Sequence, residues 1–573
     1  MKTVILLPPD VSRKIAAGEV IERPFSVVKE LVENSLDAGA DSISIELERG
    51  GKSLIRVSDD GCGLSREDAV LSFERHSTSK LRTEDDLERI ATLGFRGEAL
   101  PSIAAVSVLT MKTADGSEAA GTIVVRRPDA APEIRDAAHP RGTSVEVRDL
   151  FFNLPARRKF LRSEASELNQ IVRFVRTAAL AHPEVGFVLS HGRREILRWP
   201  PAGSPRDRLF QALGGDAADR LIEVDFTEGE SRLTGFVSRP PLGRGDRSEQ
   251  HFFVNRRPVK DRLLTAALNQ AFRGLLEKNL HPEAFLFLSH PLHEVDVNVH
   301  PAKAEIRFLD SQTVFRLVVR AIESAAAAAG GVKRLEIPSS GAETESGPAS
   351  FRQTRPPIAS SRGAGVREPD SSGALFPEAP GDSPRRRRVL GQFLETYIIA
   401  ADEEGLQIID QHNAHERILF ERFKEIRASG SLPRRQALIP ILFDLPPDRA
   451  LRVEENAALI EETGFRVEPM GGRTFSLREF PDVMAVEEAL RVFQSLLEEL
   501  GEGSADEKQD RVLALLACRA AIKAGQPLTM EKMEVLVEEL FRLPQHALCP
   551  HRRPLLVRID RSEIEKGMKR PSN

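Results

Sequence analysis

Residues 24–39, PFSVVKELVENSLDAG, place apolar and polar positions with the period of an amphipathic helix. Pro24 suits the first turn of a helix, and Gly39 stands where a left-handed C-terminal cap usually falls. Glu30, Asn34 and Asp37 are spaced i, i+4 and i+7, so they form one polar stripe opposite the apolar face. Such a stripe is most often the solvated side of a core helix. It also suits a ligand site with a carboxylate as base and an amide oxygen as metal ligand, so both hypotheses stay open here.

Alternating segments predict strands close to this helix, at 42–48 and 54–58. The second strand runs into Asp59-Asp60-Gly61-Cys62-Gly63, a glycine turn that lets a ligand approach the backbone. A hydroxyl-rich loop at 75–80, a glycine-containing loop at 94–100 and a strand at 142–147 follow. Gly97 stands at a predicted helix start, where free N–H groups suit a phosphate. Each loop alone is most often only structural.

The pattern changes twice further along the chain, which predicts separate ordered regions. A helix through about residue 181 closes the first region, and 205–330 is expected to be a second, α/β region. Its expected elements are a strand at 252–258 that ends in a basic turn, strands at 284–288 and 295–299 and a helix at 261–278. In 331–388, Gly, Pro, Ser and Arg dominate and no period holds, as is typical of a flexible linker. Order resumes at 389 with strands at 397–400 and 406–409, a helix from about 413, alternating helices and strands over 448–503 and a buried helix over 512–523.

The composition limits the classes of protein to consider. A chain of 573 residues is too long for one core, and its 41% hydrophobic and 29% charged residues are ordinary for a globular protein. The net charge of −5 means that nucleic-acid contacts would need local basic patches. Three cysteines (Cys62, Cys518 and Cys549) make no disulfide framework and fit a reducing compartment. Membrane insertion and secretion are disfavoured, because the chain has no apolar run of about 18 residues and no signal-peptide pattern.

The first group of candidate residues has the chemistry of nucleotide hydrolysis. That reaction needs a base to orient water, an oxygen ligand for Mg²⁺, backbone N–H groups for phosphates and a group that recognises adenine. The chain has no GxxxxGK[ST] pattern, so a P-loop enzyme is not indicated. The residues that fit these needs come in this order: Glu30, Asn34, Asp59, Gly63, Gly94, Gly97 and Thr143.

Several strings closely resemble the MutL mismatch-repair family, within the GHKL ATPases. They are KELVENSLDAGA (29–40), DDGCG (59–63), RHSTSK (75–80), GFRGEAL (94–100), GTSVEV (142–147), LFFNLPARRKFL (150–161) and VDVNVHPAKAEIRF (295–308). The resemblance implies an α+β multidomain protein. Its expected parts are a GHKL (Bergerat-type) α/β sandwich ATPase domain at 1–200, a transducer domain at 201–330, the linker at 331–388 and a C-terminal dimerisation and endonuclease domain at 389–573.

The resemblance also implies roles for individual residues. Glu30 would be the general base for ATP hydrolysis, Asn34 would ligate Mg²⁺, and Asp59 would bind the adenine amino group. Thr143 would lie near adenine, and Lys303 would reach the γ-phosphate from the second domain. The residues that would wrap the nucleotide are Gly63, Ser77, Thr78, Ser79, Lys80, Gly94, Phe95, Arg96 and Gly97.

A second group combines carboxylate, imidazole and thiolate, a set that suits Zn²⁺ or Mn²⁺. Its members are Asp410, His412, Glu416, Cys518, Cys549 and His551. The strings DQHNAHERILFE (410–421), ACRAAIKAG (517–525) and CPHRRP (549–554) resemble the endonuclease branch of the family. Asn413 and Arg552 depart from that branch, which usually has Ala and Gly there; neither change removes a ligand.

Two shorter segments resemble partner motifs of the family less closely. RQALIP (435–440) falls where endonuclease-type relatives carry a Gln-initiated motif for the sliding clamp, but Arg435 holds the apparent Gln position, and an ordinary strand approach explains the segment equally well. Met568-Lys569-Arg570 resembles an aromatic-Lys-Arg ending of some relatives.

Together these features predict a homodimeric, ATP-driven mismatch-repair clamp that binds DNA largely without sequence preference, is recruited by a mismatch-recognition protein of the MutS family and nicks the strand to be repaired. A bacterial, cytoplasmic and nucleoid-associated location is expected. The alternative is a matchmaker that does not nick and whose C-terminal metal site is structural. A different GHKL enzyme is disfavoured, because a histidine kinase should carry a phosphoacceptor helix before the ATPase and a topoisomerase would lack the metal cluster.

Overall fold

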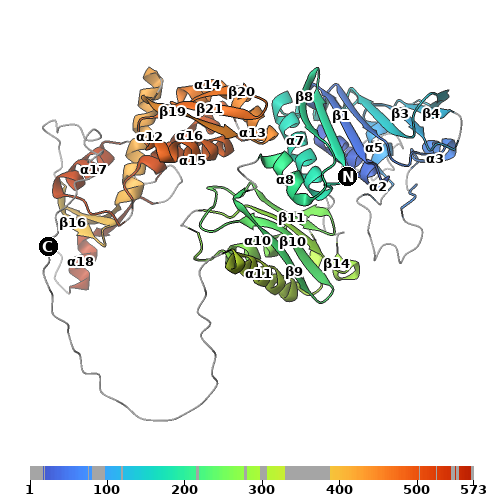
Figure 1. The fold of residues 1–573 in the computed structure, drawn as a ribbon. Coiled ribbons are helices and arrows are strands. Elements are labelled where there is room, and N and C mark those ends of the chain that lie inside the picture. The colour runs from blue at the N-terminus through green and yellow to red at the C-terminus, as the bar shows by residue number, and fades with distance from the viewer. Residues whose placement is uncertain are drawn as a thin grey trace, which may run out of the picture. The chain divides into compact units, whose positions relative to one another are not determined.

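The computed structural model describes residues 17–18, 20–74, 77–80, 94, 97–117, 120–128, 130–214, 219–276, 280–296, 306–329, 387–430, 432–501, 504–523, 525–543, 549 and 554–568. The chain divides into two compact units (Figure 1). The first unit combines Met1–Gly331 with Gly430–Val512, and the second combines Val332–Ser429 with Leu513–Asn573. Each unit is described by itself.

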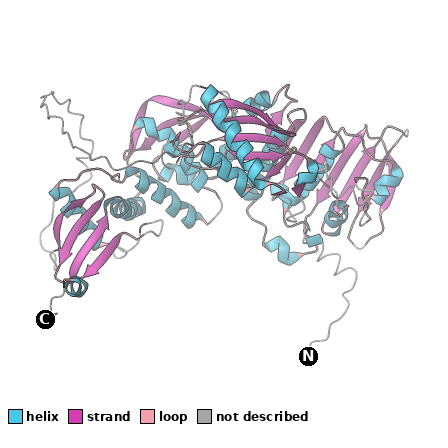
Figure 2. Ribbon diagram, turned by 90° about the horizontal axis from the view of Figure 1, so that it is seen from below, coloured by secondary structure: helices cyan, strands magenta, loops and turns pink. Residues whose placement is uncertain are grey.

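The first unit begins with an eight-stranded sheet in the order β5-β4-β3-β6-β2-β1-β7-β8. Figure 2 shows its strands in magenta, side by side in one array. Only β1 and β7 pair in parallel; the other neighbours are antiparallel. The strands are β1 (Ser42–Glu48), β2 (Leu54–Asp59), β3 (Val108–Ala114), β4 (Gly121–Arg126), β5 (Glu133–Ala137), β6 (Gly142–Arg148), β7 (Gly186–His191) and β8 (Arg194–Trp199).

The helix predicted over 24–38 is present as α2 (Pro24–Asp37), and Gly39 after it has a φ of 69°. Its apolar face is buried in the core of this sheet, and fully burying one Val or Leu side chain contributes about 1.5–3 kcal/mol. The long helix α7 (Glu164–Ala181) shares that core. The shorter helices are η1 (Arg49–Gly51), α3 (Arg66–Leu71), α5 (Ala99–Ala105), α6 (Pro155–Lys159) and α8 (Pro205–Leu213).

A five-stranded sheet follows in the order β12-β11-β13-β10-β9, with α10 (Arg262–Ala271) and α11 (Ser311–Ala328) packed in its core. The strand predicted at 252–258, ending in a basic turn, is present as β11, which stops earlier than expected, at Val254. Residues Asn255 and Arg256 take φ values of 48° and 65° and make a tight turn between β11 and β12. The helix predicted over 261–278 ends at Ala271, and of the strand predicted at 295–299 only β14 lies within the described residues. The strands are β9 (Leu221–Glu228), β10 (Ser231–Ser238), β11 (Gln250–Val254), β12 (Arg257–Val259), β13 (Ala284–Ser289), β14 (Val295–Asp296) and β15 (Arg307–Phe308), with η2 at Leu292–Glu294.

Residues 430–512 add a three-stranded sheet to the first unit, in the order β19-β21-β20. The predicted alternation of helices and strands over 448–503 is present. The elements are β19 (Arg434–Asp444), α13 (Pro447–Glu455), α14 (Ala457–Glu462), β20 (Arg466–Gly471), β21 (Thr474–Pro481) and α15 (Val486–Glu499); α16 (Ala505–Ala520) has residues in both units.

The second unit is a four-stranded antiparallel sheet in the order β16-β17-β18-β22. One face packs on α12 and α17 around a core that contains Ile398, Ile409, Ile418 and Leu536. The helix predicted from about 413 begins two residues earlier, at Gln411. The elements are β16 (Arg388–Phe393), β17 (Tyr397–Asp402), β18 (Gly405–Asp410), α12 (Gln411–Ser429), α17 (Met530–Arg542), β22 (Leu556–Asp560) and α18 (Arg561–Gly567).

Within the described residues, no helix combines the length and the apolar character that crossing a bilayer requires.

Candidate functional site

Asp59 is an acidic residue whose side chain contacts α2. It ends β2, and its carboxylate accepts hydrogen bonds from Ser35 Oγ at 2.7 Å, Gly61 N at 3.1 Å and Thr143 N at 3.2 Å. Burial raises the pKa of Asp59 above that of an ordinary aspartate, and the three donors oppose this effect. The carboxylate is therefore fixed in position by α2, its own turn and β6.

Thr143 faces Asp59 because β2 and β6 are neighbouring strands in this register. Its hydroxyl lies 2.9 Å from the Thr113 hydroxyl, which also accepts from Leu64 N at 2.9 Å. Gly63 has a φ of 68°, and a Cβ there would lie 2.0 Å from the Ala114 carbonyl oxygen. The glycine turn after β2 thus packs against β3 so closely that only glycine fits.

The stripe on α2 divides into two environments. Glu30 is partly exposed, and its carboxylate lies 3.6 Å from the Lys29 ammonium. Asn34 lies one turn further along, and its Oδ1 accepts a hydrogen bond from Lys80 Nζ at 2.9 Å. The oxygen that the sequence analysis assigns to Mg²⁺ therefore faces the cationic end of the loop at 77–80.

Asp37, which received no ligand role from its sequence, joins two loops. Its buried carboxylate contacts Lys80 Nζ at 2.5 Å and accepts from the Gly94 N–H at 3.0 Å. A Cβ on Gly94 would lie 3.3 Å from Lys80 Nζ and 3.5 Å from Asn34 Oδ1, so this glycine is close to the same groups. The i+7 position in the polar stripe was the only sequence signal for this role.

The loop residues around α2 are described in part. Thr78 Oγ1 accepts from Lys80 N at 3.1 Å, Ser77 is half-buried and Ser79 is exposed. Gly97 has a φ of 62°, and a Cβ there would lie 2.5 Å from the Ser77 carbonyl oxygen, so the loops at 77–80 and 94–97 touch. Phe95, Arg96 and Lys303 lie outside the described residues.

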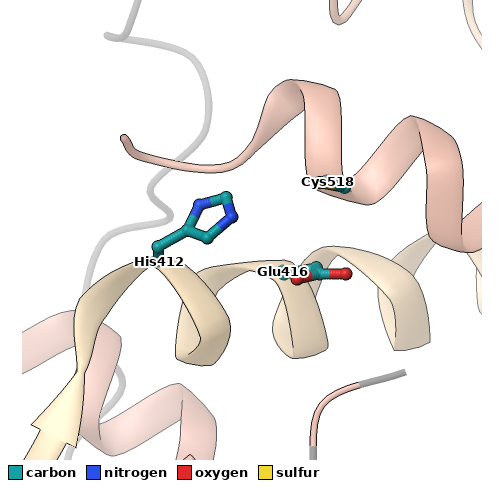
Figure 3. A group of neighbouring side chains, drawn as sticks. All are labelled: His412, Glu416 and Cys518. Carbon is teal, nitrogen blue, oxygen red and sulfur yellow. The ribbon is translucent and has the colours of Figure 1, made fainter. Parts of the chain in front are cut away.

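A separate group of possible metal ligands lies in the second unit. One ligand atom each from His412, Glu416 and Cys518 lie within 4.8 Å of one another. Figure 3 shows the His412 ring and the Glu416 carboxylate projecting from one helix and Cys518 on the facing helix. His412 and Glu416 are spaced i, i+4 on α12, so they share a face, and α16 supplies the thiol.

The backbone near Cys518 orients His412. Its Nδ1 lies 2.8 Å from the Ile522 carbonyl oxygen, which can only accept, so Nδ1 carries the proton and Nε2 is left with its lone pair. Metal-binding histidines commonly donate their second N–H in this way. The donor types and this tautomer fit a zinc or manganese ion.

His415 and Gln411 support the same region, although the sequence analysis gave neither a role. The Ile522 N–H donates to His415 Nδ1 at 3.0 Å, and burial lowers the pKa of His415 to about 4. Gln411 is fully buried, and its Nε2 donates to the carbonyl oxygens of Glu395, Lys523 and Gln526 at 3.0 Å each. These contacts fix the chain after Cys518 against the start of α12. Gln411 is part of the string at 410–421 that resembles the endonuclease branch, and that resemblance was its signal in the sequence.

The other predicted ligands are placed differently. Within the described residues, the group does not include Asp410 or Cys549. Asp410 Oδ1 accepts from Asn413 N at 2.9 Å, so this carboxylate caps the start of α12, and Cys549 is buried in the apolar core of the unit. His551 lies outside the described residues. Roles for these three as metal ligands stay predictions.

Three protein families match successive parts of the chain. Residues 22–129 match the family "Histidine kinase-, DNA gyrase B-, and HSP90-like ATPase", residues 209–327 match "DNA mismatch repair protein, C-terminal domain", and residues 390–528 match "MutL C terminal dimerisation domain". The DNA mismatch repair protein MutL of Koribacter versatilis is 38% identical over 646 residues, with 100% of both chains covered. The proteins of that name from Anaeromyxobacter dehalogenans (strain 2CP-C) and Symbiobacterium thermophilum are 39% and 38% identical, again over 100% of both chains.

Proposed function

Because the chain belongs to the MutL family of DNA mismatch repair proteins, we propose that it is an ATP-driven clamp that couples mismatch recognition to repair and nicks the strand to be repaired. The family matches identify a GHKL-type ATPase domain and a C-terminal dimerisation domain in this chain. The nicking activity rests on one observation, the group of His412, Glu416 and Cys518 on two facing helices.

In the nucleotide site, the three donors around Asp59 leave its carboxylate suited to accept from the adenine amino group, with Thr143 beside it. Glu30 would orient and deprotonate the attacking water, and Asn34 would ligate Mg²⁺. Lys80 lies against the Asn34 oxygen, so it would turn toward the phosphates when Mg²⁺ takes that oxygen. The loop residues Gly63, Ser77, Thr78, Ser79, Gly94, Phe95, Arg96 and Gly97 would enclose the triphosphate, and Lys303 would contact the γ-phosphate.

The clamp would close when ATP is bound and open after hydrolysis. The proposed domains are 1–200, 201–330 and 389–573, joined by the linker 331–388. Fully extended, that linker could reach at most about 190–210 Å. It would let the N-terminal domains of two copies close around DNA while the C-terminal domains stay paired, after recruitment by a mismatch-recognition protein of the MutS family.

The open face of the sheet β16-β17-β18-β22 is the surface that a second copy would cover. Its side chains are apolar although they lie opposite the core: the register aligns Ile399, Ile408 and Val557 in one row, and Val557 is 59% exposed. Phe393 and Tyr397 extend this row at one end. The match to a dimerisation domain over 390–528 supports a second copy as the occupant. Ile408→Asp should convert the dimer into a monomer in sedimentation, and an unchanged dimer would contradict this face.

A second surface would take the sliding clamp. Strand β19 pairs with β21 up to Gln436 and again from Ile441, so the residues between leave the ladder. Leu438 is fully exposed and Ile439 is 81% exposed. Two neighbouring apolar side chains lifted out of a sheet suit insertion into a partner's pocket. Leu438→Ala with Ile439→Ala should abolish clamp binding, while Arg435, at the apparent Gln position, should matter less.

In the proposed nuclease site, His412 Nε2, the Glu416 carboxylate and the Cys518 thiolate would hold Zn²⁺ or Mn²⁺, with Asp410, Cys549 and His551 as further candidates. A bound divalent ion would activate water and stabilise charge on the phosphate. The Ile522 carbonyl keeps His412 in the tautomer that can bind the ion.

Nicking of supercoiled plasmid in the presence of Mn²⁺ tests this activity. The wild type should nick, and Glu416→Gln and Asp410→Asn should not. Glu425→Gln is the matched control, because Glu425 is an exposed glutamate on the same helix. Equal nicking by the wild type and Glu416→Gln would remove the nuclease assignment.

The alternative function is a matchmaker that does not nick and whose C-terminal metal is structural. The helix-capping bond from Asn413 N to Asp410 favours it, because that carboxylate already has a structural role. In that case metal removal should lower the melting temperature of the protein, and the wild type should leave the plasmid intact.

A further inference from the structure

Charged side chains, five of them buried and three half-buried, gather where residues 430–512 meet the remainder of the first unit. We call residues 430–512 the docking segment. Four of these side chains come from it and four from earlier in the chain, and the two signs are balanced: Asp448, Arg449, Arg452 and Glu498 face Arg176, Arg244, Asp246 and Glu249.

Arg176 on α7 holds three elements together. Its guanidinium lies 3.3 Å from the Glu249 carboxylate, just before β11, and 3.1 Å from the Asp448 carboxylate on α13. All three side chains are at most 5% exposed. The two acidic partners raise the pKa of Arg176, although its burial opposes this. One buried cation thus connects the eight-stranded sheet domain, the five-stranded sheet domain and the docking segment.

Arg449, on α13 of the docking segment, likewise lies between two carboxylates. Its Nη2 donates to Ser248 Oγ at 2.5 Å, and it lies 3.3 Å from Glu249 and 3.0 Å from Glu498. The side chain is 2% exposed. Glu249 therefore receives one arginine from α7 and one from the docking segment. Burial opposes the charged form of Glu249, but Arg176, His251 and Arg244 hold its pKa below the usual range.

Contacts around this cluster widen the interface. Arg194 and Glu454 form a two-point salt bridge at 2.7 and 2.9 Å. Arg473 donates to the carbonyl oxygens at the C-terminal end of α8, at 2.6 Å to Gln211 and 3.2 Å to Ala212. Leu451 belongs to the apolar core that α2 and α7 share. The interface thus combines apolar burial, a charged centre and capping of a helix.

Buried charges are costly to remove from water, so this contact is stable only when every partner is present. A surface that needs several matched arginines and carboxylates at once is selective for one occupant. Arg176 and Arg449 both bond to the five-stranded sheet domain through Glu249, so occupation also fixes that domain relative to α7.

We propose that residues 430–512 are a docking module that binds across the junction of the ATPase domain and the next domain of the same chain, and that it holds these two domains in one orientation. Nucleotide binding would change that orientation and release the module. The docking itself follows from the contacts above. Its release by nucleotide rests on the proposed function, in which Lys303 moves to the γ-phosphate.

Cross-linking of the full-length chain tests the docking. Arg194→Cys with Glu454→Cys replaces an exposed pair whose side chains meet across the interface. A short bis-maleimide should join the two cysteines within one chain, so the product keeps the monomer mass under denaturing conditions. Mass spectrometry of the linked peptides separates this product from links made by native cysteines. A product of twice the monomer mass would place the contact between two copies and overturn the proposal.

Variants of the cysteine pair show whether the buried charges hold the docking segment in place. Asp448→Arg in the cysteine pair should lower the docking equilibrium by roughly a hundredfold, because a buried charge loses its partner. Arg473→Ala is a milder second variant that keeps the charged centre intact and should lower the yield less. Glu461→Arg is the matched control, since Glu461 is exposed and pairs with Arg434 inside the segment. Equal yields in all four chains would overturn the docking.

The release is tested by adding a non-hydrolysable ATP analogue to the cysteine pair. The cross-linking yield should fall severalfold, and an unchanged yield would overturn the release. Analogue binding to the same sample is measured in parallel. A chain that docks but binds no nucleotide would contradict the proposed function and leave the docking intact.

Discussion

In the proposed nucleotide site, the carboxylate of Asp59 receives three donors, of which two are backbone N–H groups in a strand or a turn. In the group of His412, Glu416 and Cys518, one candidate ligand atom from each side chain lies near the other two, and the Ile522 carbonyl orients the imidazole. One site is formed by the sheet register, while the other depends on how two helices pack.

Because of this difference, single substitutions should affect the geometry of the two sites differently. Register places Asp59 beside Thr143 through many shared ladder bonds, so a single substitution there should remove one contact and leave the geometry. The second group brings a carboxylate and a thiol together, and in the proposed site a bound cation would offset the charge of the two ligands. The following predictions test that contrast.

The largest effect is expected at Glu30. Glu30→Ala should bind ATP but hydrolyse it about 10²–10⁴-fold more slowly, because the water loses its general base. Single-turnover hydrolysis and nucleotide binding measure the two steps separately. Glu48→Ala, at the exposed end of β1, is the control. Full turnover in Glu30→Ala would exclude the role as base.

Glu416→Gln should weaken metal binding by about 10–100-fold or more, because a charged oxygen ligand is lost. Titration calorimetry with Zn²⁺ and with Mn²⁺ measures this change, and Glu425→Gln should bind as the wild type does. Unchanged metal affinity would show that the group is an ordinary buried cluster.

Asp59→Asn should weaken ADP binding by about 10–100-fold, since the charged acceptor for the adenine amino group is lost and a charge-assisted hydrogen bond contributes about 1.5–3 kcal/mol. GDP should bind no worse to the variant than to the wild type. If ADP affinity does not change, Asp59 has no part in recognising the base.

The same carboxylate should make ADP affinity depend on pH. Burial raises the pKa of Asp59, so it takes up its proton at a higher pH than an ordinary aspartate. Protonation removes the negative acceptor, so affinity should fall as the pH is lowered toward that pKa, starting above the usual value of about 3.9. The profile of Asp59→Asn should be flatter, and identical profiles would contradict this origin.

The smallest effect is expected at Asp37. Asp37→Asn keeps an acceptor for Gly94 N but loses the charge that holds Lys80, so hydrolysis should fall only severalfold. Limited proteolysis within the described loop at 77–80 should become faster in the variant. Unchanged proteolysis and hydrolysis would mean that the two loops are held by other contacts.

Much of the fold was predictable because the spacing of apolar residues indicates helices and strands locally. The helix at 24–38, the strands at 42–48 and 54–58 and the alternation over 448–503 all follow from apolar spacing. The basic turn at the end of the strand over 252–258 was predictable from its residue types, but the short strand β12 after it was not. Asn255 and Arg256 adopt positive φ values in this turn. Pairing between β11 and β12 stabilises the turn, as do two hydrogen bonds between the Asn255 side chain and the His290 backbone.

By itself, the sequence determined the family, the order of the loops around α2 and the residue types available for chemistry, because these depend on short-range spacing and on whole motifs. Tertiary structure alone decided that Asp37 joins Lys80 to Gly94 and that Arg176 meets Asp448. It also decided which predicted metal ligands of the described residues form the group, because Cys518 lies with His412 and Glu416 while Asp410 and Cys549 do not join them. These partners are separated by 43 to 272 positions, and nothing in local spacing relates them. They meet because burial of apolar surface brings their elements together, and the polar groups trapped there must then find partners.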